Sequence, residues 1–579
     1  MPPLTEKQRE KVIEWVENWE KNLNTTRDLF AISLVFCELG IYDERIEKYL
    51  LLAEKMQDRN PESKTYGNFK WYLNSEKVVD LNSVEFSLRE GFLIWIRHRE
   101  KLSKKAVEIL ERLLNIGIKG VLNHSVPVRY TNIFLIKTWN LIAYGENFDN
   151  EEIKNMGYRN LDEWLIYTKE NGIREYASPN YYHVDITALG LIYNYTKNSE
   201  IRRKSEIALK LFWTDLALNF FEPAGRIGGS KSRDYDYLYG RDGVETLLTY
   251  YGWIEKPEDY FYKYLVALSP YKPDETIKEL NKKYPRYIER KIGNRKGEWA
   301  CHYLGKEFSL GVCGIPYSPQ DKPLVFLFSS KELPNGYLIF DARNDPYGEK
   351  LEIMPWSGGE HKVYLHLVPF FTANQDKNEI IMYANIDASD PSIPRIAPNV
   401  SGFYTHFVFP FVEVYINKKE INLKKEEKIK FLNDDVLIVK YKNAAIGIRI
   451  FYAKDMYGNS AEIYLINDGN KYNVLRLTVV HSDKEEKNGR GEIAFYIRGE
   501  DDIEDEKNIE EFYEKMKNMK FEIKQENNIY EIYKDSILKL KFNPLKNERV
   551  VDNEVKCILG IDGEDIGSKI LSEIKGGTL

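Results

Sequence analysis

Polar, titratable and aromatic residues gather in two stretches of this 579-residue chain. The first covers residues 175–185, and its polar and aromatic members include Glu175, Ser178, Tyr181, Tyr182, His183 and Asp185. The second is a glycine-rich stretch at 225–237, whose charged and aromatic members include Lys231, Arg233, Asp234, Tyr235, Asp236 and Tyr237. Buried polar groups cost folding stability unless each finds a partner. We therefore expect both stretches to serve a site, facing each other across a sugar-binding cleft.

The first stretch contains a sharp turn before a helix. Proline disfavours helical backbone at the residue before it, so Ser178 ahead of Pro179 is predicted to form a turn. Tyr181 and Tyr182 then lie at a helix N-terminus, where the helix dipole modestly lowers the pKa of an acidic group. The chain has 41 tyrosines, so plain packing is the competing interpretation for both. Glu175 fits equally well as an exposed loop acid or as a partner that orients a neighbour.

The second stretch combines glycines with cations. Glycine lets the backbone turn sharply or approach a ligand closely. Lys231 and Arg233 supply positive charge, and arginine offers a planar fork that fits a carboxylate. Asp234 and Asp236 could hold the arginine or a tyrosine in place. A phosphate-binding loop is excluded because no strand precedes the glycines and no GKS or GKT sequence follows. A solvated turn is the competing interpretation.

A third group precedes or opens a helix near residue 131. Its members are Asn123, His124, Arg129 and Asn132. Thr131 with Asn132 could equally be an ordinary helix cap, and a lone loop histidine lies more often on the surface than in a catalytic site. The histidines of the second half show neither HxH nor HExxH spacing, which gives a metal cluster little support.

Composition limits the class of protein. A chain of this length exceeds one core, so two domains are expected, and 43% hydrophobic with 30% charged residues is typical of a soluble globular protein. The net charge of −7 argues against nucleic-acid binding. No apolar run reaches about 18 residues, so we expect no membrane span. The charged N-terminus lacks a signal peptide, which favours the cytoplasm and leaves secretion open. Abundant Lys, Glu, Ile and Tyr are typical of a thermophile.

Residues 1–268 are predicted to form ten or eleven helices. In 103–117, Ala106, Leu110 and Leu113 share one stripe, Ser103 can cap the start and Gly117 can end the helix. Similar patterns occur at 6–22, 26–39, 43–57, 84–98, 131–144, 159–170, 183–197, 200–221, 241–252 and 257–268. Because no sequence repeat is visible, a ring of helical hairpins is favoured over a solenoid.

Residues 269–298 are rich in charge and proline, and we expect a linker with one short helix. From Trp299 to the end, 299–579, the apolar pattern has a period of two, as in 444–452 and 537–542. Turns are expected at Asn335-Gly336 and Asp468-Gly469. The prediction is an antiparallel β-sandwich with one helix near 505–518. The chain is thus a multidomain α and β protein, an N-terminal (α/α) toroid followed by a sandwich.

This order of domains, together with the 175–185 stretch, resembles polysaccharide lyases of the (α/α)-toroid class. The likeness is to heparinase II/III-like enzymes, alginate lyases and hyaluronate or chondroitin lyases. Their motif holds a glutamate, a serine and a tyrosine followed by histidine. Glu175, Ser178 and Tyr181 match it, while Tyr182 takes the histidine place and His183 follows one step later.

The resemblance implies β-elimination at a uronic acid in an acidic oligo- or polysaccharide. Donors must neutralise the carboxylate, because the proton next to it is poorly acidic. Tyr181 is expected as base and acid, its pKa lowered by nearby cations, with His183 or His124 as helper. Asn132 (otherwise Asn123) and Arg233 are expected on the carboxylate. Further substrate contacts are expected from Asn123, His124, Arg129, Glu175, Tyr182, Lys231, Tyr235 as a sugar platform, and Tyr237. No cofactor is required, although the sandwich leaves room for a structural divalent cation.

Two other functions stay open at this point. A glycoside hydrolase on an (α/α) ring would use two carboxylates, and Glu175 with Asp234 or Asp185 with Asp242 could serve. A non-catalytic glycan-binding protein would need aromatic platforms without a titratable pair. The product distinguishes them, since only elimination leaves an unsaturated uronide that absorbs in the near ultraviolet.

Overall fold

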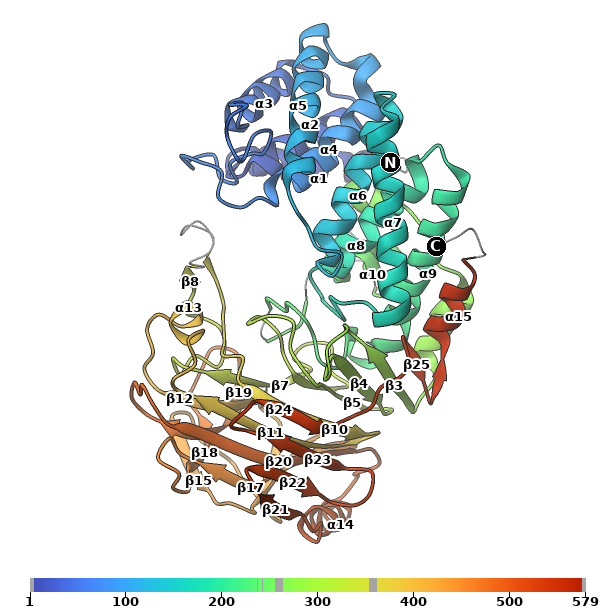
Figure 1. The fold of residues 1–579 in the computed structure, drawn as a ribbon. Coiled ribbons are helices and arrows are strands. Elements are labelled where there is room, and N and C mark those ends of the chain that lie inside the picture. Colours follow the sequence, from blue (N-terminus) through green and yellow to red (C-terminus); the bar gives the residue numbers. More distant parts are fainter. Residues whose placement is uncertain (1–4, 237, 242, 256–263, 354–361, 575–579) are drawn as a thin grey trace.

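The computed structural model describes residues 5–236, 238–241, 243–255, 264–353 and 362–574. Its N-terminal half is helical and its C-terminal half consists of antiparallel sheets (Figure 1). The main helices of the first half are α1 (Glu6–Glu20), α2 (Thr26–Glu38), α3 (Glu44–Met56), α4 (Ser83–His98), α5 (Lys104–Asn123), α6 (Thr131–Asn147), α7 (Glu151–Asn171), α8 (Tyr182–Tyr195), α9 (Ser199–Asn219), α10 (Gly243–Tyr250) and α11 (Tyr264–Leu268).

The helices form hairpins in two layers. Helices α2, α4, α6, α8 and α10 contact one another in succession, and α2, α4, α6 and α8 also pack against their hairpin partners α3, α5, α7 and α9. Burial follows the layers: 14 of the 17 residues of α6 are buried, against 6 of the 21 in α7. The inner helix α6 is therefore buried nearly all round, while the outer helix α7 buries a single stripe. This arrangement confirms the predicted (α/α) toroid.

The ends of α5 show one correct and one wrong prediction. The Ser103 hydroxyl accepts a hydrogen bond from the Ala106 backbone at 3.1 Å, so Ser103 caps the helix as expected. Gly117 does not end it, since α5 continues to Asn123. A Cβ at Gly117 would lie 2.8 Å from a methyl group of Leu88 on α4. The glycine allows α4 and α5 to pack closely and has no capping role.

Three antiparallel layers form the second half. The order of the 11-stranded sheet is β15 (Glu427–Phe431), β18 (Glu462–Asn467), β19 (Val474–Ser482), β12 (Phe403–Pro410), β7 (Asn335–Asp341), β6 (Leu324–Phe328), β5 (Phe308–Cys313), β4 (Trp299–Leu304), β3 (Arg286–Lys291), β25 (Gly560–Ile561) and β26 (Glu564–Asp565). The order of the seven-stranded sheet is β10 (Phe370–Asp376), β11 (Glu379–Asp387), β20 (Arg490–Glu500), β17 (Ala444–Lys454), β16 (Val436–Tyr441), β13 (Glu413–Ile416) and β14 (Lys419–Glu420). These counts refer to the described residues.

The two large sheets pack face to face, with β5 against β10 and β20. A four-stranded sheet covers the outer face of the seven-stranded one and consists of β21 (Glu522–Glu526), β22 (Ile529–Tyr533), β23 (Lys539–Asn543) and β24 (Glu548–Val551). Helix α14 (Glu506–Lys517), close to the predicted 505–518, packs on β16 and β17. The predicted antiparallel sandwich is confirmed.

The two turn predictions in the sandwich have opposite outcomes. Asp468-Gly469 lies between β18 and β19, and Gly469 has a φ of +67°, as a tight turn requires. Asn335-Gly336 is no turn, because it begins β7 and pairs with Leu327 and Phe326 of β6. A Cβ at Gly336 would lie 2.0 Å from the Phe326 ring, so this glycine makes room for an aromatic side chain.

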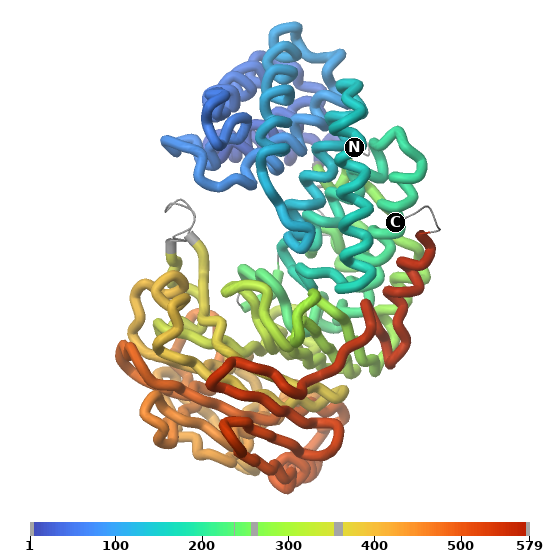
Figure 2. Tube along the Cα trace, in the orientation of Figure 1, coloured from blue at the N-terminus to red at the C-terminus, as the bar shows by residue number. Residues whose placement is uncertain are grey.

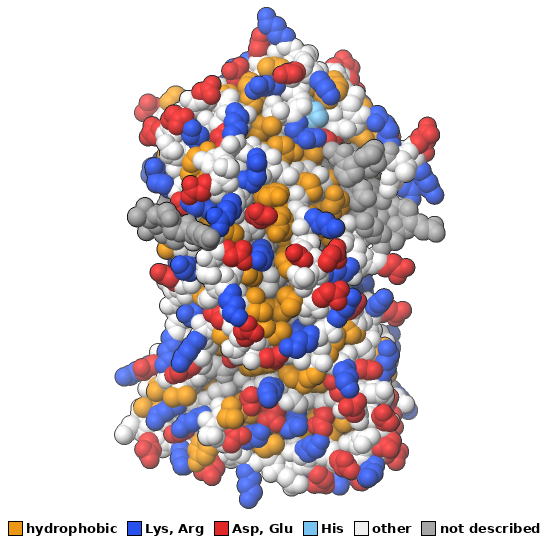
Figure 3. Space-filling view, turned by 90° about the vertical axis from the view of Figure 1, so that its right-hand side faces the viewer, with side chains coloured by type: hydrophobic (Ala, Val, Ile, Leu, Met, Phe, Trp, Pro, Cys, Tyr) orange, Lys and Arg blue, Asp and Glu red, His pale blue; other side chains and the backbone are white. Residues whose placement is uncertain are grey.

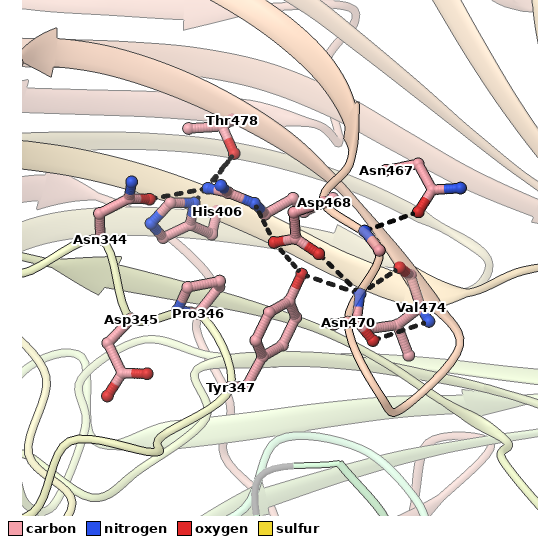
Figure 4. A network of polar contacts seen from close by, with 12 residues as sticks. Asn344, Asp345, Pro346, Tyr347, His406, Asn467, Asp468, Asn470, Val474 and Thr478 are labelled. Carbon is pink, nitrogen blue, oxygen red and sulfur yellow. Dashed lines mark hydrogen bonds and ion pairs between the residues drawn. The ribbon is translucent and has the colours of Figure 1, made fainter. Parts of the chain in front are cut away.

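A polar network holds the loop after β7 against the Asp468-Gly469 turn (Figure 4). The Tyr347 hydroxyl donates to Asp468 at 2.6 Å, and the Asn470 amide donates to both side chains. Arg343, on the same loop, donates to the backbone carbonyl of Leu365. The network thus supports the segment at 363–365 that lines the cavity described below.

The chain crosses between the two halves more than once. The segment 269–298 contains α12 (Glu275–Glu279) and β3, which pairs with β4 and β25 in the large sheet. After β25 the chain returns to the helical half, where α15 (Ile566–Ser572) packs against α7 and α9 (Figure 2). Buried ion pairs cross the interface at Asp215–Arg290 (2.5 Å) and Arg174–Glu298 (2.8 Å).

Surface charge is mixed on the face that includes α15. Acidic and basic side chains alternate around an apolar stripe there (Figure 3). Among the described side chains on this face, no continuous positive strip is present. No helix in the described part of the chain is both long and apolar enough to cross a membrane.

Candidate active site

A cavity of about 590 Å³ lies where the helical half meets the sandwich. Its helical side comes from the loop before α4 and from the N-termini of α6 and α8, and its other wall from the β5–β6 loop and the segment after β9 (Lys362–Val363). The described lining residues are Trp71, Val79, Asp80, Leu81, Asn82, Phe86, His124, Tyr130, Asn132, Ile133, Tyr181, Arg233, Tyr235, Tyr317, Ser318, Pro319, Gln320, Val363 and Leu365. The cavity therefore brings together residues from all three predicted groups.

Ser178 shapes the entry to α8. Its hydroxyl accepts a hydrogen bond from the Tyr181 backbone at 3.0 Å, and Tyr181 is the last residue before the helix. The expected turn at Ser178-Pro179 is thus present, and it points the Tyr181 ring into the cavity. The competing packing interpretation fits Tyr182 instead, because that side chain is fully buried and donates to Asp215.

Arg233 contacts both aromatic and acidic residues of the site. Its guanidinium carbon is 4.0 Å from the ring centroid of Tyr181 and 5.7 Å from that of Tyr130. One nitrogen pairs with Glu175 at 2.9 Å. The side chain keeps 15% of its surface exposed, toward the cavity. Glu175 is thus neither an exposed loop acid nor a direct substrate ligand, since it is buried and orients the arginine.

The Tyr181 hydroxyl lies 2.9 Å from the Tyr235 hydroxyl, and the two rings meet edge to face. Burial raises the pKa of Tyr181 well above its ordinary value, although the Arg233 guanidinium opposes the rise. The structure therefore does not show the expected net lowering of the Tyr181 pKa by cations, because burial outweighs the guanidinium. Arg233 and the Tyr235 hydroxyl remain the groups that could stabilise a phenolate at Tyr181.

Asn132 borders the cavity from the first turn of α6, and its side-chain amide is buried there. Its backbone nitrogen donates to Glu175 at 2.8 Å, so one glutamate orients both Asn132 and Arg233. Neither atom of the buried amide has a hydrogen-bond partner among the described residues. The helix cap position belongs to Tyr130, which rules out the plain cap interpretation of Asn132. A buried amide without partners at the edge of a cavity leaves hydrogen-bonding capacity that a bound ligand could use.

The two candidate helper histidines are placed differently. His124 lines the cavity, and its Nδ1 lies 2.9 Å from Glu85, a buried carboxyl whose pKa is raised by burial. The ring of His183 packs instead against Gly243, and its Nδ1 contacts the backbone carbonyl of Asn180. His183 is not part of the described lining, so only His124 remains in position.

Several predicted contacts lie away from the cavity. Asn123 and Arg129 are exposed on the surface, and Asn123 ends α5. Lys231 is fully buried, 3.8 Å from Asp234, and burial lowers its pKa to about 8. Like Tyr182, these residues are absent from the described lining, so the structure does not bring them to the cavity. Tyr237 lies outside the described residues.

Pairing with the sandwich holds the Arg233 loop. Lys231 and Lys322 form an antiparallel bridge, and the Asp234 nitrogen donates to the Gln320 carbonyl at 3.0 Å. Between them the Arg233 nitrogen donates to Asp321 at 2.8 Å, and Arg233 has a φ of +47°. A non-glycine residue adopts this left-handed conformation only where its surroundings impose it. Burial raises the pKa of Asp321 to about 6.

Sequence reasoning missed part of the site, chiefly Trp71, Asp80, Tyr130 and Tyr317. Tyr130 stands between Arg129 and Asn132, so the tyrosine count masked it. Tyr317 precedes Ser318-Pro319, the same local pattern that marked Ser178-Pro179. Trp71 lies between Lys70 and Tyr72 in the loop before α4, where no sequence motif indicated a site.

Acidic groups are scarce in the cavity. Asp80 is the one carboxylate among the described lining residues. Glu175 pairs with Arg233, and Asp234 lies 3.0 Å from the Lys322 ammonium, both away from the lining. Asp242 lies outside the described residues. Within the described ranges, no three His, Cys, Asp or Glu side chains gather as a metal site.

Comparison with known proteins gives distant matches. Residues 29–245 match a family described as a domain of unknown function (DUF8769), a span that includes Asn132, Glu175, Tyr181 and Arg233. No curated protein matches the chain.

Solved structures that match include a chondroitin AC lyase of Streptomyces coelicolor A3, which shares 9% identity at a TM-score of 0.44, with 90% of this chain and 80% of that one covered. A heparinase III shares 13% identity at 0.35, with 89% and 83% covered. A heparan sulfate lyase of Pedobacter heparinus shares 10% identity at 0.35, with 89% and 81% covered. These are polysaccharide lyases, the class that the sequence resembles. Since the TM-scores are below 0.5, the chemistry is argued from this chain's own residues.

Proposed function

We propose that this protein is a polysaccharide or oligosaccharide lyase that cleaves a uronic-acid-containing glycan by β-elimination. The observation that carries the proposal is the meeting of the Tyr181 hydroxyl, the Arg233 guanidinium and the unpartnered Asn132 amide in one cavity. Tyr181 would supply the proton-transfer group, and Arg233 and Asn132 would supply hydrogen-bond donors to the substrate carboxylate. Elimination next to a carboxylate needs both.

The chemistry follows from the charges. Removing the C5 proton of a uronate places a second negative charge on a group that is already anionic. Arg233 and the Asn132 amide would bind that carboxylate and stabilise the charge as it develops. The Tyr181 oxygen would take the proton while the Tyr235 hydroxyl, 2.9 Å away, donates to it. The electron pair left on C5 would then form the C4–C5 double bond as the C4–O4 glycosidic bond breaks, and Tyr181 would return the proton to the leaving oxygen.

His124 and the aromatic side chains complete the proposed site. His124, held by Glu85, lies in the cavity as a second group able to move a proton. Trp71, Phe86 and Tyr317 offer apolar faces on which sugar rings can stack. Asp80 could accept hydrogen bonds from sugar hydroxyls.

Hydrolysis fits the cavity less well. A hydrolase places two carboxyl groups on either side of the scissile bond, and the described lining offers one. The deciding experiment is a panel of uronate-containing glycans assayed in parallel for near-ultraviolet absorbance and for new reducing ends. A rise in both supports elimination, whereas new reducing ends without absorbance would make the protein a hydrolase.

A further inference from the structure

Asp185, in the first turn of α8, is a buried acid that the proposed reaction does not use. Its side chain is fully buried, and neither carboxyl oxygen has a hydrogen-bond partner among the described residues. The neighbouring buried acid, Glu175, is fully engaged: one oxygen pairs with Arg233 at 2.9 Å and the other accepts from the Asn132 nitrogen at 2.8 Å. Both buried acids interact electrostatically with Arg233, and only Glu175 is bonded to it.

The carboxyl groups of Asp185 and Glu175 cannot both carry a negative charge when Arg233 is bonded to only one of them. A buried carboxylate without partners loses its hydration and gains nothing in return, so the neutral acid is favoured. Burial, with Glu175 next, raises the pKa of Asp185 well above its ordinary value against the pull of Arg233. Burial also raises the pKa of Glu175, which Arg233 and, more weakly, Arg174 oppose. Glu175 has the ion pair and the backbone donor, so Asp185 is the acid that keeps a proton.

We propose that Asp185 is a positioning residue whose carboxyl group stays protonated in the folded protein at neutral pH, leaving Glu175 to act as the anion opposite Arg233. A charged Asp185 would draw on the same guanidinium and add negative charge behind it. A neutral Asp185 occupies the same volume without competing with Glu175 for the Arg233 guanidinium. The consequence of this protonation state for substrate binding rests on the proposed function. Arg233 would meet an incoming uronate with Glu175 as its one counterion, instead of Glu175 and Asp185 together.

The test is the stability of Asp185→Asn as a function of pH, which needs no substrate. Asparagine has the shape of the neutral acid and cannot ionise. An acid with a raised pKa contributes stability that is fully present below its unfolded pKa, about 4, and is lost as pH rises toward its folded pKa. The wild type should lose this contribution progressively as pH rises above about 4, and D185N should not. The unfolding temperature of D185N relative to wild type should therefore climb with pH, by about 1–3 °C.

Asp215 offers a matched control. It is also a buried aspartate of the helical half, but it pairs with Arg290 at 2.5 Å and accepts from Asn219 at 2.9 Å. Asp215→Asn breaks an ion pair, so the unfolding temperature of this variant should be lower than that of the wild type at every pH from 5 to 9. If D185N behaves like D215N, with a deficit at every pH that does not shrink, Asp185 is ionised and the proposal is overturned.

A second measurement covers the event that D185N does not fold. Infrared spectra of the wild type with 13C-labelled aspartate carboxyls should show a protonated-aspartate band that persists at pH 8. A spectrum at pH 8 without such a band would overturn the proposal. Neither measurement uses catalysis. If the wild type yields no unsaturated product from any uronate glycan, the proposed function fails while the unfolding and infrared results still decide the protonation of Asp185.

Discussion

The guanidinium carbon of Arg233 lies 4.0 Å from the ring centroid of Tyr181, although 51 residues separate them along the chain. One belongs to a loop held by the sandwich and the other to the start of a helix. The proposed proton-transfer group and its electrostatic partner therefore depend on both halves of the molecule. The predictions below test that arrangement.

Replacing Tyr181 by phenylalanine should lower kcat for elimination by about 100- to 10,000-fold, because the phenolic oxygen carries the proton. The matched control is Tyr182→Phe. That change removes a buried hydrogen bond to Asp215 and should lower the free energy of unfolding by about 1–3 kcal/mol, with kcat largely kept. Steady-state kinetics and thermal unfolding of both variants give the measurement. Equal activity of Y181F and wild type would refute the assignment.

The rate of elimination should increase with pH into the alkaline range. Burial raises the pKa of Tyr181, so its phenolate, the form that accepts the proton, becomes populated only as pH rises. The pH profile of kcat/KM reports the ionisation of the free protein and is the quantity to measure. A profile that falls above neutral pH would mean that another group is the base.

Arg233→Lys keeps the charge and loses the planar fork that pairs with Glu175 and, in the proposed reaction, binds the substrate carboxylate. We expect kcat/KM to fall about 100-fold. Arg226→Lys, in the same glycine-rich loop, is the control, since its guanidinium donates to the backbone carbonyls of Tyr239, Gly225 and Lys331 outside the cavity. R226K should cost stability and leave KM near that of the wild type. Comparable kinetic losses in the two variants would remove Arg233 from the site.

Asp321→Asn should lower both stability and kcat, although Asp321 does not itself line the cavity. The Asp321 oxygens accept from the backbone nitrogens of Arg233 and Tyr317 and from the Ser318 hydroxyl. An amide NH2 would face one of these donors, at a cost of about 1–3 kcal/mol in unfolding free energy. Because the Arg233 backbone is held at positive φ, we expect kcat to fall as well, although Asp321 does not line the cavity. An unaltered kcat would show that the loop keeps its conformation without this acid.

Trp71→Ala should raise KM for longer oligosaccharides and leave the shortest cleavable one nearly unaffected. Trp71 lines the cavity and packs edge to face on Phe86 at 5.9 Å, a rigid apolar face for a sugar ring. Kinetics on a series of chain lengths provide the test. A uniform loss across all lengths would assign Trp71 to the folding of the loop.

Much of the architecture was predictable because it depends on local pattern. Helices such as 26–39 and the strand at 444–452 follow from periodicity, and Ser103 follows from capping. Gly117 and Gly336 were misassigned because each serves a neighbour distant in sequence, Leu88 in one case and Phe326 in the other.

The site shows the same division between local and distant information. Tyr181, Asn132 and Arg233 were proposed from their local types and do meet at one cavity, whereas Lys231 and Tyr182 lie outside its lining, because the sequence does not show which way a side chain points. The positive φ of Arg233 accompanies a hydrogen bond to Asp321 of the sandwich, and the Tyr181 ring packs against Arg233 and Tyr235 from a loop distant in the sequence. No local pattern in the sequence reports those contacts.

The packing of the C-terminal helix α15 on the helical half affects how the protein unfolds on heating. Since α15 closes on α7 and α9 after the whole sandwich has been traversed, neither half can come apart without detaching the other. Calorimetry should accordingly record one heat-absorption peak in place of two, and removing residues 566–579 should split or broaden it.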